Sequence, residues 1–188
     1  MRKLIYLVGV SVDGYIAAPD GSADGFPMDP DVLQRVFAEY PETCPSHLRE
    51  ALAVTADARH FDTVVMGYRT HAPALDAGLT SAYPHLDQYV VTHRQDLPRD
   101  PKVTIVHDDP VAMVQDLKRQ DGKDIWLCGG ADLAGQLIDE VDELHLKVYP
   151  VLFGSGIPLV AGMMTLPVRL QSSQSLGSGV LLSIYTST

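Results

Sequence analysis

The sequence lacks the features that mark several large protein classes. It has two cysteines, Cys44 and Cys128, which form no Cys-x-x-Cys pair, so neither a disulfide framework nor a thiol redox motif is predicted. No apolar run reaches the ~20 residues that a membrane span requires, so no membrane partner is expected. The seven histidines show no His-x-x-x-His or Glu-x-x-His spacing, so no metal site is expected either.

Positive charge is also scarce, because 14 lysines and arginines face 24 acidic residues and leave a formal net charge of −10. A nucleic-acid surface needs a basic patch, so no nucleic-acid partner is expected. The N-terminus begins like a signal peptide, but its apolar run is short and Ser11-Val12-Asp13-Gly14 follows without an obvious cleavage site. We therefore interpret it as a buried strand, and we expect a cytoplasmic protein with a single domain over residues 1–188.

Standard nucleotide and nucleophile motifs are missing as well. The sequence has no Gly-x-Gly-x-x-Gly, so a standard Rossmann dinucleotide site is excluded. It has no Walker A motif and no Gly-x-Ser-x-Gly, which weakens an ATPase or a hydrolase interpretation. Any nucleotide site must therefore be built in another way.

Hydrophobic patterning predicts strands that alternate with helices. The expected strands are residues 3–10, 63–66, 89–92, 103–106 and 125–128, and the expected helices are residues 31–40, 45–58, 109–119 and 132–140. This rhythm favours a parallel sheet with right-handed crossovers. Residues 13–30 form a long polar loop, which we interpret as a lid because loops of this length in compact chains are commonly functional.

The C-terminal part shows a different pattern. Residues 143–148 alternate between apolar and polar side chains, and residues 168–176 and 180–186 flank Gly177-Ser178-Gly179 as the strands of a β-hairpin would. These strands should add an antiparallel edge to the sheet. The predicted fold class is therefore α/β, with a mixed, mainly parallel sheet and an antiparallel C-terminal hairpin.

Three predicted strands end in residues that suit the phosphates of a dinucleotide. Gly67-Tyr68-Arg69-Thr70 offers a tight turn, a cation and a hydroxyl that could cap the next helix, and Thr92-His93-Arg94 offers a second cation. Gly129-Gly130 precedes a helix, whose first N–H groups can hold a pyrophosphate. Each motif alone is common in turns and surface loops. Together they favour a nucleotide site, because ligands of open α/β sheets bind at the carboxyl ends of the strands.

Five segments follow one another in the order of a known family. They are residues 11–17 (SVDGYIA), 65–70 (VMGYRT), 89–92 (YVVT), 128–133 (CGGADL) and 141–159 (VDELHLKVYPVLFGSGIPL). Through these segments, which span nearly the whole chain, the sequence resembles the dihydrofolate reductase-like family. Within it, the resemblance is to the branch of the C-terminal reductase domain of the riboflavin-biosynthesis deaminase/reductase.

The resemblance implies a three-layer fold, NADPH bound across the carboxyl ends of the strands, and a homodimer. It implies nicotinamide contacts from Gly9, Ile16 and Ala17. It implies pyrophosphate and ribose contacts from Gly67, Arg69 and Thr70, 2′-phosphate contacts from Thr92, His93 and Arg94, and further pyrophosphate contacts from Gly129, Gly130, Ala131, Asp132 and Leu133. The family often has a cis peptide bond between the two glycines.

Two departures from the family pattern bear on the chemistry. The family has Gly-Arg-x-Thr, whereas here Arg69 stands one position later. A folate reductase carries an acid early in its first helix, and here Asp31 is the candidate proton donor, although it could equally serve only to stabilise the helix N-terminus, with Asp29 as the cap.

The predicted function is an NADPH-dependent reductase that transfers a hydride to a small heterocyclic (pteridine- or pyrimidine-like) or carbonyl-type substrate. The alternatives are a non-catalytic nucleotide-binding protein on the same fold and a reductase of the riboflavin-pathway type.

Overall fold

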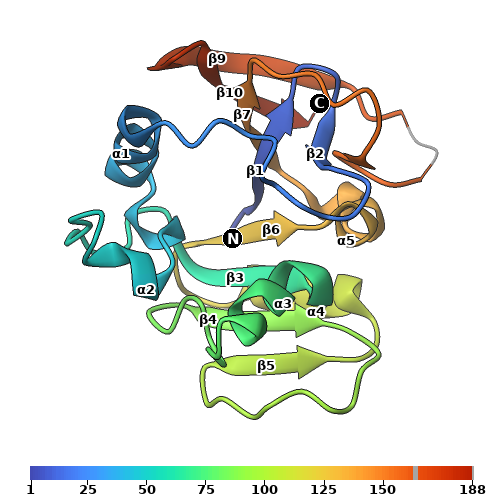
Figure 1. Cartoon of the computed structure of the whole chain (residues 1–188). Coiled ribbons are helices and arrows are strands. Elements are labelled where there is room, and N and C mark those ends of the chain that lie inside the picture. The colour runs from blue at the N-terminus through green and yellow to red at the C-terminus, as the bar shows by residue number, and fades with distance from the viewer. Residues whose placement is uncertain (163–164, 188) are drawn as a thin grey trace.

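The computed structural model describes residues 1–162 and 165–187 and shows a twisted sheet with helices on both faces (Figure 1). The strands are β1 (Leu4–Ser11), β2 (Tyr15–Ala17), β3 (Phe61–Gly67), β4 (Asp87–Val91), β5 (Val103–Val106), β6 (Asp124–Gly129), β7 (Glu143–Tyr149), β8 (Ile157–Pro158), β9 (Val168–Gly177) and β10 (Val180–Ser187). The α-helices are α1 (Pro30–Glu39), α2 (Ser46–Arg49), α3 (Tyr68–Asp76), α4 (Pro110–Arg119) and α5 (Ala131–Gln136), and η1 (Pro41–Thr43) and η2 (Ile138–Glu140) are 3₁₀ turns.

The main sheet has the strand order β5-β4-β3-β6-β1-β7-β10-β9. Strands β5 to β7 in this order pair in parallel, whereas β10 runs antiparallel to both β7 and β9. The predicted mixed sheet with an antiparallel C-terminal hairpin is therefore confirmed. Because the parallel strands point the same way, their carboxyl ends meet at one edge of the sheet.

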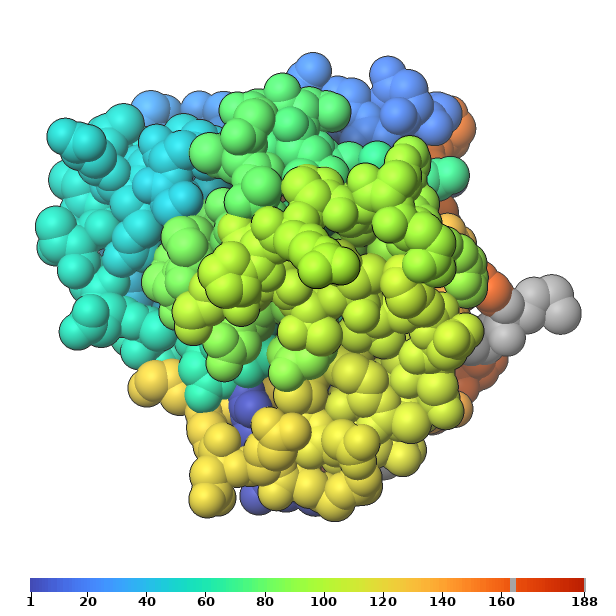
Figure 2. Space-filling model, turned by 90° about the horizontal axis from the view of Figure 1, so that it is seen from below, coloured from blue at the N-terminus to red at the C-terminus, as the bar shows by residue number. Residues whose placement is uncertain are grey.

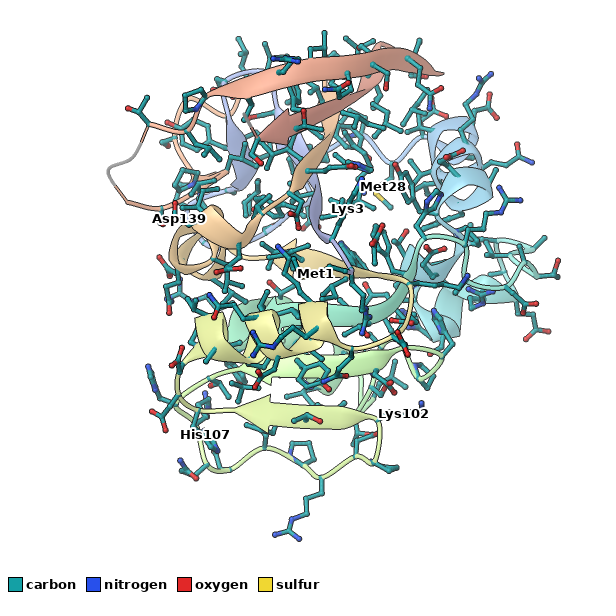
Figure 3. The ribbon with its side chains drawn as sticks, turned by 180° about the vertical axis from the view of Figure 1, so that it is seen from behind. Met1, Lys3, Met28, Lys102, His107 and Asp139 are labelled. Atoms are coloured by element: carbon teal, nitrogen blue, oxygen red, sulfur yellow. The ribbon has the colours of Figure 1, made fainter. Side chains whose placement is uncertain are left out.

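Two apolar clusters hold the helices against the two faces of the sheet. On one face, Val32 and Val36 of α1 pack with Ile5, Leu7 and Trp126 of the strands. On the other face lie α4 and α5, and α4 stands in front of the sheet when the molecule is seen from behind (Figure 3). The side chains that these two helices bury there are Val114, Leu117, Leu133 and Ala134. The predicted three layers are thus present.

Strand β5 forms one edge of the sheet. In Figure 3, Lys102 and His107 lie at its two ends, so His107 marks the carboxyl end and Lys102 the amino end. Figure 2 shows the molecule from this side, where the yellow-green segments of β5 and α4 cover much of the surface. Within the described part of the chain, none of the helices has both the length and the hydropathy that a membrane span needs.

The Asp29-Pro30 and Asp109-Pro110 pairs begin helices as expected. The Asp29 carboxylate accepts a hydrogen bond from the backbone N–H of Asp31 at 2.8 Å, and the Asp109 carboxylate accepts one from Ala112 at 2.9 Å. In both helices the proline occupies the first turn, where its missing N–H costs nothing.

The helix predicted over residues 45–58 is wrong in length, because only Ser46–Arg49 is helical. Its expected apolar face is incompletely covered, since Leu48 and Leu52 are each 38% exposed. Isolated short helices are marginal in water, so this segment continues as turns, with Ala53 at a positive φ of 52°. The Arg49 guanidinium holds the turns together by donating to the carbonyl oxygens of Pro41 and Ala56.

The short elements β2, β8, η1 and η2 were not predicted. Residues 13–30 contain the strand β2, which pairs with β8 beside the main sheet. Helix α5 ends at Gln136 and is followed by the separate turn η2, whereas the sequence predicted one helix over residues 132–140.

Candidate active site

Two glycine turns meet at the carboxyl edge of the sheet. Gly67 ends β3 and begins α3, and Gly129-Gly130 ends β6 and begins α5. A Cβ placed on Gly67 would lie 3.8 Å from the carbonyl oxygen of Gly129, and one placed on Gly130 would lie 3.9 Å from the hydroxyl oxygen of Thr70. The fold therefore brings together two motifs that are about sixty residues apart in the sequence. Their proximity follows from the parallel pairing of β3 with β6.

The cap of α3 differs from the prediction. Gly67 is the N-cap, and no side chain caps the helix. Thr70 is not the cap, because it lies inside the first turn. Its hydroxyl lies near Gly130 and does not cap its own helix. The first N–H groups of α3 remain available to an anion.

Thr92 and Arg94 join the same edge from β4. The Arg94 guanidinium lies 4.7 Å from the ring centroid of Tyr68, the first residue of α3. The Thr92 hydroxyl accepts a hydrogen bond from the Arg94 backbone N–H at 3.1 Å, which fixes the turn after β4. Arg94 is also paired with the exposed Asp96 at 3.2 Å. The cation expected at a 2′-phosphate is therefore close to α3, but it already has an acidic partner.

The other predicted phosphate-binding side chains lie at the surface of this edge. Arg69 and His93 are exposed, and Arg69 stands on the first turn of α3. His107, which the strand-end reasoning left out, bonds through Nδ1 to the carbonyl oxygen of Thr92 at 2.8 Å. A signal for it was present, since His107 directly follows the predicted strand at residues 103–106.

At α5 the backbone, and not the side chains, faces this edge. Ala131 and Leu133 are 5% and 4% exposed, and Leu133 packs into the core behind the sheet. Asp132 is exposed on the first turn. The peptide bond between Gly129 and Gly130 is cis, as expected from the resemblance.

The residues predicted to contact a nicotinamide lie on β1 and β2. Gly9 is on β1, and a Cβ there would come within 3.2 Å of the ring of Tyr149. Ile16 and Ala17 are on β2, which lies beside β1 (Figure 1). A larger residue than glycine at position 9 would therefore press on the Tyr149 ring.

The turn between β1 and β2 is fixed by Asp13. Its carboxylate accepts hydrogen bonds from the backbone N–H groups of Phe153 and Gly154, the latter at 2.7 Å. The Ser11 hydroxyl donates to the same carboxylate at 2.6 Å and lowers the pKa of the Asp13 carboxyl. Asp13 thus ties the start of the 13–30 loop to the segment after β7.

Phe26 anchors the far end of the same loop. Its ring centroid lies 5.0 Å from that of Tyr149 and 4.9 Å from that of Phe153, and the residue is 8% exposed. The predicted lid is therefore fastened at both ends. Whether it moves on ligand binding stays a prediction.

A cavity of about 240 Å³ opens beside Gly9, between α1 and the sheet. It is lined by Leu7, Val8, Gly9, Leu33, Val36, Phe37, Thr43, Pro45, Tyr83, Trp126, Cys128, Lys147 and Tyr149. Every second residue of a strand points to the same face, so Trp126 and Cys128 of β6 lie together, as do Lys147 and Tyr149 of β7. Most of the side chains that line the cavity are apolar, and a few polar ones stand among them, as in sites for small ligands.

Comparison with known proteins identifies the family. The sequence matches the family of the RibD C-terminal domain over residues 2–182. It is 30% identical over 186 residues to the protein YwjB of Bacillus subtilis (strain 168), with 96% of each chain covered. This chain belongs to the RibD C-terminal domain family.

The solved structures show the same fold. RibD of Acinetobacter baumannii has a TM-score of 0.68 at 17% identity, covering 100% of this chain and 58% of its own. Dihydrofolate reductase of Enterococcus faecalis, complexed with NADP(H), has a TM-score of 0.61 at 14% identity, covering 99% of this chain and 96% of its own. The predicted dihydrofolate reductase-like fold and the resemblance to the RibD branch are both confirmed.

Asp31, the predicted proton donor, does not line the cavity. Asp31 is exposed on the first turn of α1, and the residues of α1 that line the cavity are Leu33, Val36 and Phe37. No aspartate or glutamate is among the described residues that line it. The proton-donor role of Asp31 stays a prediction, and this geometry supports its other interpretation, a residue at a helix N-terminus.

Lys147 and Cys128 are two titratable cavity residues that sequence reasoning missed. Burial lowers the pKa of the Lys147 ammonium and raises the pKa of the Cys128 thiol to about 12. Lys147 stands in register with Gly9 on β1. Strand alternation could have flagged it, since a lysine two residues before Tyr149 falls on the same face as that buried ring.

Over residues 1–162 and 165–187, no cluster of three His, Cys, Asp or Glu side chains could hold a metal ion.

Proposed function

We propose that this chain is an NADPH-dependent reductase that transfers a hydride to a small heterocyclic or carbonyl-type substrate. One observation carries the proposal. The two glycine turns and the Thr92–Arg94 segment converge at one edge of the sheet, beside an apolar cavity that reaches Gly9. Membership of a reductase-type family supports the same function.

The residues at this edge fit a dinucleotide. Backbone N–H groups at the start of α3 and the Thr70 hydroxyl would hold the pyrophosphate, and Arg94, once released from Asp96, would meet the 2′-phosphate. Gly9, Ile16 and Ala17 would lie against the nicotinamide. When bound, NADPH supplies the hydride. The cavity walls orient the substrate and keep water away from it.

NADPH titration tests the proposal directly. Trp126 lines the cavity, so its fluorescence should change as NADPH binds, and the melting temperature should rise by mass action. NADPH oxidation should then be measured with a panel of pteridines, pyrimidines and small carbonyl compounds. If neither the fluorescence nor the melting temperature changes at millimolar NADPH, the proposal is wrong.

A non-catalytic nucleotide-binding protein is the second candidate. One observation favours this candidate: none of the described residues that line the cavity is a carboxylate. A carboxyl group is the usual proton donor in a folate-type reduction. NADPH binding without turnover of any compound in the panel would support this candidate. A reductase of the riboflavin-pathway type would instead turn over the pyrimidines in the panel.

We further propose a homodimer, as the resemblance to the family implies. Light scattering coupled to size-exclusion chromatography distinguishes a dimer from the 20.4 kDa monomer.

A further inference from the structure

We infer that the cavity binds a small substrate that carries an anionic oxygen, such as a carboxylate or an ionised ring oxygen, and that Lys147 recognises this oxygen. The inference rests on the proposed reductase function and narrows its substrate class. Three features of the cavity carry it: its charge, its position and its walls.

The first feature is an unpaired positive charge. Lys147 is the single charged residue among the described residues that line the cavity. Its ammonium group makes no hydrogen bond or ion pair with any other described residue. The other lysines near the ends of the parallel strands differ in this respect, since Lys3 pairs with Glu143 at 2.6 Å and Lys118 with Asp142 at 2.8 Å.

Lys147 is half-buried. An ammonium without a counter-ion in such a place costs free energy, because burial disfavours the charged form. The lowered pKa of Lys147 agrees with this. The neighbouring Cys128, Tyr83 and Tyr149 do not supply a negative charge, since burial raises the pKa of each. A bound anion would therefore supply the counter-ion that the Lys147 ammonium lacks.

The second feature is position. Lys147 pairs in register with Gly9, the residue expected to lie against the nicotinamide. A substrate oxygen on Lys147 would hold the substrate next to the carboxyl ends of β1 and β7. Lys147 thus lies where it can orient a hydride acceptor, whereas a lysine at the rim could only attract one.

The third feature is the wall opposite. Helix α1 presents Leu33, Val36 and Phe37 to the cavity. A substrate with a cationic ring would require a carboxylate partner, and the described lining residues include none. The walls and the lysine together favour a flat apolar body with one anionic oxygen, and disfavour a protonated pteridine.

Benzoate and benzamide form a matched pair of probes, because they have nearly the same shape and differ in charge. Binding is followed by Trp126 fluorescence and by melting temperature. We expect benzoate to bind at least ~10-fold more tightly than benzamide, as a charge-assisted hydrogen bond predicts. Lys147→Met should remove this preference and leave benzamide binding unchanged, whereas Lys147→Arg should retain it.

Lys102→Met is the control variant, since Lys102 is exposed, pairs with Asp87 and lies at the amino end of β5 (Figure 3). It should behave as the unaltered protein does. If Lys147→Met fails to fold, Lys147→Gln takes its place. Equal affinity for the two probes, no binding of benzoate, or a preference that survives in the Met or Gln variant would overturn the inference. NADPH titration of the same variants keeps this outcome separate from a failure of the proposed function.

Discussion

The edge proposed to bind the cofactor and the cavity proposed to bind the substrate are built in opposite ways. The edge at β3, β4 and β6 is open, polar and made largely of backbone, with exposed cations such as Arg69 and Arg94. The cavity between β1, β6, β7 and α1 is apolar and contains one charged side chain, Lys147. The difference indicates that backbone groups of the sheet edge supply one half of the proposed site, whereas side chains supply the other half.

The largest expected effect concerns Phe26, whose ring contacts Tyr149 of the cavity wall. Phe26→Ala should lower the free energy of unfolding by ~3–5 kcal/mol, because it removes a buried ring that packs on Tyr149 and Phe153. Phe26→Leu, which keeps much of the volume, should cost clearly less. Urea unfolding measures both variants. Similar stability of Phe26→Ala and the unaltered chain would show that the 13–30 loop is not anchored there.

Arg94→Ala tests the cofactor edge. NADPH affinity should fall by ~10- to 100-fold while NADH affinity hardly changes, since the guanidinium is expected to meet only the 2′-phosphate. Asp96→Asn is the matched variant, because it frees Arg94 from its ion pair and should tighten NADPH binding. An equal loss for both cofactors in Arg94→Ala would assign this arginine another role.

A smaller effect is expected on the pH dependence of stability, through His145 of β7. Burial lowers the pKa of His145, against the opposing influence of Glu143, while His60 and Lys3 lower it further. The folded chain then holds His145 neutral, so its contribution to stability is complete above pH 6.5 and is lost as the pH falls toward the folded pKa. Urea unfolding at pH 7.5 and 5.5 should show this loss.

His145→Gln is the control for this pH effect. The variant should lose some stability at both pH values, because the ring bonds to the Tyr40 hydroxyl at 2.8 Å. Its difference in stability between the two pH values should be smaller than that of the unaltered chain. An unchanged difference would assign the pH dependence to His71 and His85, whose pKa values burial also lowers.

The smallest effect is expected from Asp31→Asn. Because Asp31 is exposed and stands at a helix N-terminus, its loss should cost ~0.3–1 kcal/mol of stability. Turnover of any substrate found should survive. A drop in kcat of ~10²-fold or more with NADPH binding intact would instead restore the proton-donor hypothesis.

The glycine turns of the proposed cofactor edge were predictable because their groups are local. Each glycine turn is continuous in sequence and directly follows a short apolar strand, as at Gly67 and Gly129-Gly130. The cavity was not predictable in the same way, since its lining comes from separate strands, α1 and the η1 turn. The sequence pointed to Asp31 because it is an acid next to the predicted lid. Lys147 was identified only from the pairing of β7 with β1.

By itself the sequence determined the alternation of strands and helices, the mixed sheet, the Asp-Pro helix starts and the glycine turns, because these depend on side-chain periodicity and local backbone preference. Only the tertiary structure decided the rest. Helix α2 is short, and the tertiary structure covers Leu48 and Leu52 only in part. Arg94 reached Tyr68, and Lys147 came to lie across from Gly9, through contacts between distant segments. Such contacts depend on strand order and register, which no single stretch of sequence encodes.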